Sequence, residues 1–156
     1  MKFSSEKLFD TFFFTLIFIW CIGILWEVVI YFFPNLIVAL PFLKYNYSIV
    51  CHQEPEKLFS IGNYKTLVCS RCTGIYFGAL FSSIIALTGL IRKTNTKVLL
   101  FSSIPMFIDV VLYSFGLYSY SKTIALFTGL LLGSVGFIYI QDALKIILFK
   151  QKKETF

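Results

Sequence analysis

Charged residues are scarce in this chain of 156 residues. Asp, Glu, Lys and Arg together make up 14% of it, against about 25% in a typical soluble domain. Histidine occurs once. Cysteine occurs four times, which is too few for a disulfide-dense secreted scaffold. The sequence also lacks a phosphate-binding loop, a haem-attachment Cys-x-x-Cys-His motif and an HExxH helix, so the common signatures of enzymes are missing.

Apolar residues are abundant instead. The hydrophobic fraction is 58%, and phenylalanine alone occupies 19 positions. A compact domain of this length has too little interior to bury so much apolar surface, so the excess must face lipid. The formal net charge of +6 is then typical of cytoplasmic loops and of contact with anionic head groups rather than of nucleic-acid binding. The sequence therefore predicts an integral membrane protein whose partner is the lipid bilayer, with no nucleic-acid partner.

Four stretches are long and apolar enough to cross a bilayer as helices, which takes about 20 residues. They lie at residues 11–33, 72–91, 98–118 and 123–140. The connections between the last three are short, which predicts antiparallel neighbours. The fold class that follows is an all-α membrane bundle of four helices, with residues 1–156 forming a single domain. A signal peptide is the alternative for the first stretch, but the run is too long and acidic Glu6 and Asp10 flank it.

Basic residues are divided unevenly between the two sides of such a bundle. The side that carries the chain termini has nine, and the other side has five. The positive-inside rule then predicts that both termini are cytoplasmic, in the plasma or inner membrane, and that the segment between the first two spans lies outside. Residues 35–50 are apolar but short and contain Pro41 and Lys44. They predict a re-entrant or interfacial segment rather than a fifth span.

Small residues recur along two of the predicted spans. They are Gly74, Gly78, Ser82 and Ala86 in the second, and Ala125, Gly129, Gly133 and Gly136 in the fourth. Such spacing makes a flat helix face that another helix can approach closely. We expect these faces to pack within the bundle, and a homodimer through them is the alternative.

Three of the four cysteines and the single histidine fall between residues 51 and 72. Cys51 and His52 are adjacent, and Cys69 and Cys72 form a Cys-x-x-Cys pair. Thiolates and imidazole are ligands that zinc prefers, so these four residues predict a metal site. Two other interpretations of the pair stay open, a structural disulfide in an oxidising compartment and a redox-active thiol pair. Cys21 lies within the first span and is expected to be a small packing residue.

Ionisable groups within the predicted spans form a second candidate feature. A charge at the bilayer centre costs about 2.5–3.5 kcal/mol even on insertion scales, so it is rarely accidental. Glu27, Asp109 and Arg71 fall inside or at the ends of spans, in the half nearest the Cys/His segment. We expect either an Arg71–carboxylate pair that closes the bundle or a polar cavity that opens outward.

A longer motif surrounds the Cys/His segment. It reads Cys51-His52-Gln53 and then Cys69-Ser70-Arg71-Cys72-Thr73-Gly74-Ile75-Tyr76-Phe77-Gly78. This motif resembles the signature of a family of small membrane proteins known as domain of unknown function 2085. Pro105 and Asp109 resemble a second element of that family, with Val110 where glycine is usual. The resemblance spans about residues 35–136 and implies a multi-span membrane fold with a Cys/His site, but no established reaction.

Three functions agree with this sequence. The first is a metal site, with zinc as the expected ion, that is either structural or supports chemistry on a lipid-soluble or periplasmic substrate. In its catalytic form His52 is a ligand or acid–base group, Arg71 binds an anionic group and Asp109 lines the cavity. The second is a membrane thiol–disulfide or quinone-linked oxidoreductase that uses Cys69 and Cys72. The third is a non-enzymatic assembly or transport accessory protein with a structural disulfide.

Overall fold

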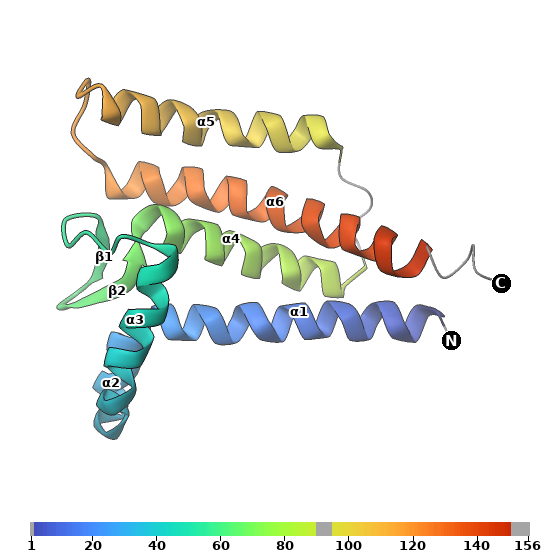
Figure 1. The fold of residues 1–156 in the computed structure, drawn as a ribbon, viewed down its shortest axis with the longest axis horizontal. Helices are drawn as coiled ribbons and strands as arrows, with labels where there is room; N and C mark the ends of the chain where they lie inside the picture. Colours follow the sequence, from blue (N-terminus) through green and yellow to red (C-terminus); the bar gives the residue numbers. More distant parts are fainter. Residues whose placement is uncertain (1, 90–94, 151–156) are drawn as a thin grey trace.

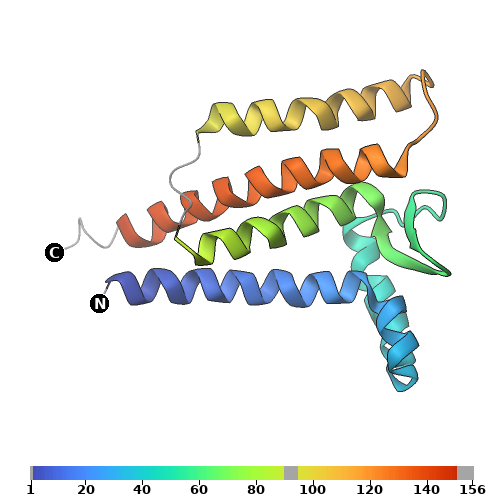
Figure 2. The same ribbon diagram turned by 180° about the vertical axis from the view of Figure 1, so that it is seen from behind.

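The computed structural model describes residues 2–89 and 95–150. Four long helices lie side by side in the order α1, α4, α6 and α5 (Figures 1 and 2). Their bounds are α1 Lys2–Ile24, α4 Ser70–Leu87, α5 Thr96–Ser114 and α6 Lys122–Lys150. Each is long and apolar enough to cross a membrane. The predicted helical membrane fold with four spans is therefore confirmed, and the start of α1 and the end of α6 lie at the same end of the bundle (Figure 1).

The first predicted span, residues 11–33, is too long at its C-terminal end. Helix α1 stops at Ile24, and a separate helix α2 (Trp26–Phe32) turns sharply from it and runs away from the other long helices (Figures 1 and 2). Glu27 therefore lies outside the span, and its carboxylate accepts a hydrogen bond from the Lys65 amide (2.9 Å) and pairs with Lys44 (3.5 Å). The prediction that Glu27 lies within the first span is wrong, because the helix that could cross the membrane ends at Ile24 and Glu27 belongs to α2.

The segment predicted as re-entrant or interfacial is helical. A 3-10 helix, η1 (Pro34–Ala39), leads into α3 (Leu40–Val50), and both lie beside α2 at the end of the bundle opposite the termini (Figure 1). Two hydrogen bonds hold this segment to the preceding helices. The Trp26 indole donates to the Leu36 carbonyl (3.2 Å), and the Tyr47 hydroxyl donates to the Trp20 carbonyl (2.7 Å).

A small β-hairpin at the same end was not predicted. Strands β1 (Leu58–Ile61) and β2 (Tyr64–Cys69) pair antiparallel. The turn between them uses Gly62, whose φ of +62° is readily adopted only by glycine. Strand β2 carries Leu67 and Val68 into a small core with Ile24. This core fixes the hairpin on the end of α1, directly beside the N-terminus of α4.

The small-residue faces of α4 and α6 pack against each other, as expected, except at Gly136, where an added Cβ atom would meet Leu99 of α5 instead. A Cβ atom added at Gly78 would lie 2.3 Å from the Leu130 carbonyl oxygen, and one at Gly133 would lie 2.1 Å from that of Ile75. Only glycine permits so close an approach of two backbones. These faces are thus used inside the chain, and a homodimer would have to form through another surface.

Candidate metal centre

Three cysteines meet where α3 ends and α4 begins. Cys51 directly follows α3, and its amide donates to the Tyr47 carbonyl (3.0 Å), the last bond of that helix. Cys69 is the last residue of β2 and the N-cap of α4, and Cys72 lies in the first turn of α4. The Cys-x-x-Cys pair therefore spans a strand-to-helix junction, where the free amides of a helix N-terminus favour negative charge.

The sulfur atoms of Cys51, Cys69 and Cys72 all lie within 4.8 Å of one another. In a tetrahedral zinc site with Zn–S bonds of about 2.3 Å, the sulfurs are about 3.8 Å apart, so small side-chain rotations would close this group around an ion. Cys51 is buried, and the other two are half-buried. All three are free thiols, as is Cys21, which is buried on α1. Because Cys21 is not part of the group, the expectation that it only packs is unaffected.

Hydrogen bonds favour the thiolate form of Cys51. Its sulfur accepts hydrogen bonds from the thiols of Cys69 and Cys72, from the Cys69 amide (3.2 Å) and from the Gln53 amide. Together they hold the pKa of Cys51 well below its ordinary value, while the bond that Cys69 donates raises the pKa of Cys69. Gln53 has a left-handed backbone (φ 51°), which turns the chain back sharply after α3. A thiolate supported by amide donors is suited to bind a metal.

His52 lies outside the sulfur group. Its side chain is exposed and lines a cavity of about 200 Å³, which the three cysteines also line. The structure thus brings together three of the four predicted ligands, and the role of His52 stays a prediction.

Arg71 and Asp109 form an ion pair between α4 and α5, with 2.5 Å between Nη2 and Oδ2. Asp109 is only 4% exposed and also accepts a hydrogen bond from the Tyr118 hydroxyl, which raises the pKa of Tyr118 to about 12. Arg71 lines the cavity beside the cysteines, whereas Asp109 does not. The predicted Arg71–carboxylate pair is therefore present, and Asp109 contacts Arg71 without lining the cavity itself.

Lys57 also lines this cavity, and sequence reasoning missed it. Its ammonium group pairs with Glu54 (2.6 Å) and lies 4.8 Å from the centre of the Tyr113 ring. Its carbonyl accepts hydrogen bonds from the amide (2.8 Å) and hydroxyl (3.0 Å) of Ser70. Lys57 reaches the site because the hairpin returns the chain to the start of α4, and no local pattern signals that return.

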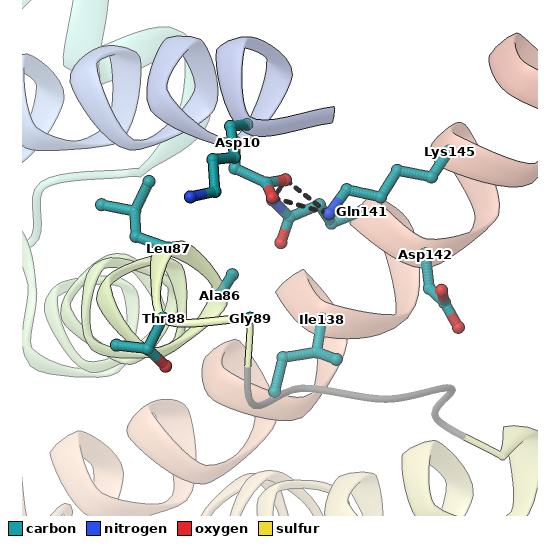
Figure 3. A pocket seen from close by; sticks show the side chains of 10 residues that line it. Asp10, Ala86, Leu87, Thr88, Gly89, Ile138, Gln141, Asp142 and Lys145 are labelled. Carbon is teal, nitrogen blue, oxygen red and sulfur yellow. Dashed lines mark hydrogen bonds and ion pairs between the residues drawn. The ribbon is translucent and has the colours of Figure 1, made fainter. Parts of the chain in front are cut away.

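A second buried polar group lies at the opposite end of the bundle (Figure 3). Asp10 accepts a hydrogen bond from the Gln141 amide (2.6 Å) and pairs with Lys145 (2.6 Å), beside a cavity of about 280 Å³. Sequence reasoning missed this group because Asp10 and Gln141 are 131 positions apart. The spacing of Gln141 and Lys145, one helical turn apart, is the signal that could have drawn attention to it.

The fold and the site together define a small membrane protein of several spans with a cysteine cluster at the end of the bundle opposite its termini. The chain belongs to a family described as "Predicted membrane protein (DUF2085)", whose model matches residues 51–139. The family suggested by the Cys/His motif is therefore confirmed. The match begins at Cys51, so it covers less of the N-terminal part than the resemblance suggested.

Two similar proteins come from archaea, and both are uncharacterised. One, from Methanocaldococcus jannaschii, is 33% identical over 113 residues, which are 69% of this chain and 71% of that protein. The other, from Methanothermobacter thermautotrophicus, is 35% identical over 101 residues, which are 64% of this chain and 90% of that protein. No solved structure matches the chain.

Proposed function

We propose that this membrane protein holds a zinc ion on Cys51, Cys69 and Cys72. The observation that carries the proposal is the approach of the three sulfur atoms to within 4.8 Å of one another. Three thiolates are soft ligands that suit zinc and are unsuited to magnesium or calcium. The hydrogen bonds that lower the pKa of Cys51 support the same conclusion.

Three protein ligands leave one position of a tetrahedral zinc ion for a further ligand. The cavity beside the cysteines is where that ligand can enter, and His52, Lys57 and Arg71 line it. His52 is the candidate for the fourth ligand of a structural site. In a catalytic site, that position would be open to a water molecule or substrate atom, His52 would transfer protons and Arg71 would bind an anionic group.

Metal analysis of the full chain, purified in mild detergent without chelator, tests the proposal. We expect about one zinc ion per chain. Each single serine variant of Cys51, Cys69 or Cys72 should lose most of the metal. The control variant Cys21→Ala changes a buried cysteine outside the group and should keep its metal. Equal metal content in all four variants, or none in the unmodified chain, would overturn the proposal.

His52→Ala separates the two kinds of site. If His52 is the fourth ligand, the variant should bind zinc more weakly, and the pH dependence of binding should change because imidazole binds only when neutral. If a water molecule occupies the fourth position, zinc content should stay as it is.

We further propose that both termini are cytoplasmic and that the cysteine site faces the outside. The nine basic residues on the terminal side, against five on the other, support this orientation. A membrane-impermeant thiol reagent, applied to intact cells after metal removal, should label Cys69 and Cys72 but not Cys21. Labelling that requires permeabilised cells would reverse the orientation.

A membrane oxidoreductase is the second candidate function, because the Cys-x-x-Cys pair lies at a helix N-terminus with free thiols. Oxidation of Cys69 and Cys72 to a disulfide would release two protons and two electrons, which a quinone or another disulfide would accept. A reversible disulfide with a potential well above about −300 mV, in a protein without zinc, would support this function. A disulfide that resists reduction would instead favour the accessory protein with a structural disulfide.

A further inference from the structure

One face of α3 is apolar and exposed. Phe42, Tyr45 and Ile49 are spaced by three and four residues, and 69%, 70% and 71% of their surfaces are exposed. This spacing places them on one side of the helix, here named the α3 stripe. Helix α3 lies across the end of the long helices (Figure 1). At that level of a bilayer an apolar helix face fits the boundary between head groups and acyl chains.

Helix α3, which carries the α3 stripe, ends at the cavity beside the cysteines. Val50, the last residue of α3, is 47% exposed and lines that cavity, and Cys51 follows it. Lys57 and Arg71 form another part of the cavity wall, together with Glu54, the carboxylate that pairs with Lys57. The cavity at the end of α3 thus contains two cationic groups and one carboxylate.

We infer that the cavity takes its ligand from the membrane, and that this ligand is an amphipathic lipid with an acidic head group. The head group lies in the cavity, which at about 200 Å³ has no room for acyl chains. The chains lie along the α3 stripe. This inference rests on the proposed function for its site and names the substrate class.

The groups in the cavity suit a phosphate or carboxylate head. The guanidinium of Arg71 pairs with Asp109 through Nη2, and the Arg71 side chain, which lines the cavity, is 20% exposed. A planar guanidinium matches the oxygens of such a head group. A water-soluble anion would use the same donors but would leave the α3 stripe without a partner. A second copy of the chain could cover the stripe but would not need the cationic groups.

Photo-crosslinking in nanodiscs tests the inference with the full chain. The discs contain phosphatidylcholine with a minor fraction of phosphatidylglycerol, and benzoylphenylalanine replaces Ile49 or, as a control, Phe115. Phe115 is 77% exposed and is not among the residues that line the cavity. Mass spectrometry of the adducts should show severalfold enrichment of the anionic lipid at residue 49 and the bulk composition at residue 115. Lys57→Gln and Arg71→Gln should each return residue 49 to the bulk composition.

Each other result overturns the inference. Adducts at residue 49 that follow the bulk composition, or an enrichment that neither substitution reduces, would exclude a specific lipid. Crosslinks between chains would make the α3 stripe a dimer surface, and loss of enrichment with added glycerol phosphate would indicate a soluble ligand. Zinc is measured in the same samples. Lipid enrichment without zinc refutes only the metal proposal, and zinc without lipid enrichment refutes only this inference.

Discussion

Replacement of Gly129 by alanine tests whether the close packing of α4 and α6 holds the cysteine site in shape. A Cβ atom at residue 129 would lie 2.3 Å from the carbonyl oxygen of Arg71, whereas ordinary contacts begin near 3.4 Å. The carbonyl must therefore retreat by the difference, about 1.1 Å. Because this atom belongs to backbone rather than to a flexible side chain, the first turn of α4 has to move. Cys72 is the next residue and moves with it.

The expected effects are large enough to measure. Insertion of a methyl group into a well-packed contact costs about 1–3 kcal/mol. Metal sites tolerate displacements of about 0.2 Å in their ligand distances, far less than the shift expected here. We therefore expect Gly129→Ala to lower the free energy of unfolding by about 1–3 kcal/mol. We also expect zinc affinity to fall by about tenfold or more, which corresponds to a loss of at least about 1.4 kcal/mol in the free energy of zinc binding.

Unfolding in one detergent and zinc competition with a chelator are the assays. Gly136→Ala is the matched control on the same helix, because a Cβ atom there would meet only a Leu99 methyl group at 3.9 Å. Alanine is favoured over glycine in a helix by about 1 kcal/mol, so this control should be at least as stable as the unmodified chain. If Gly129→Ala matches Gly136→Ala in stability and zinc affinity, the reasoning is wrong.

Three further predictions concern polar groups. Arg71→Ala should lower the free energy of unfolding by about 3–5 kcal/mol because it leaves the buried Asp109 carboxylate without its partner. The double variant with Asp109→Asn should be no less stable than Arg71→Ala alone. Strictly additive losses would mean that the two residues are not coupled. Lys145→Gln should lower the free energy of unfolding by about 1–3 kcal/mol because Asp10 loses its charged partner. If Lys145→Gln lowers it by the same amount in a chain that already carries Asp10→Asn, this reasoning is wrong. Zinc should be released as the pH falls, because protons compete with the metal for the three sulfur atoms; metal content that is constant from about pH 8 to 5 would refute it.

Much of the candidate site could be predicted from sequence because its cysteines are close in the chain. A Cys-x-x-Cys pair brings Cys69 and Cys72 together over one helical turn, whatever the rest of the fold does. The position of Cys51 beside this pair could not be predicted from local spacing, since it depends on the turn at Gln53 and on the hairpin. His52 could not be settled by spacing, because adjacent side chains at the end of α3 point in different directions.

The membrane spans show the same division between local and distant information. Hydropathy predicted four spans, since the length of an apolar run is a local property. It placed the end of the first span too late, because α2 is as apolar as α1. The direction of α2 depends on the contacts of its Glu27 with Lys65 and Lys44, which come later in the chain.

The sequence by itself determined that this chain lies in a membrane, that it crosses it as helices and that thiols gather near one end. These properties follow from composition, from runs of apolar residues and from short spacings, all of which act within a few helical turns. Only the tertiary structure decided which polar groups are partners. Arg71 pairs with Asp109 on another helix. Asp10 accepts a hydrogen bond from Gln141 and pairs with Lys145, both of which lie far from it in the chain. Such pairs form because the contact of the glycine faces of α4 and α6 sets how the helices lie side by side, and burial then requires each charge to find a partner.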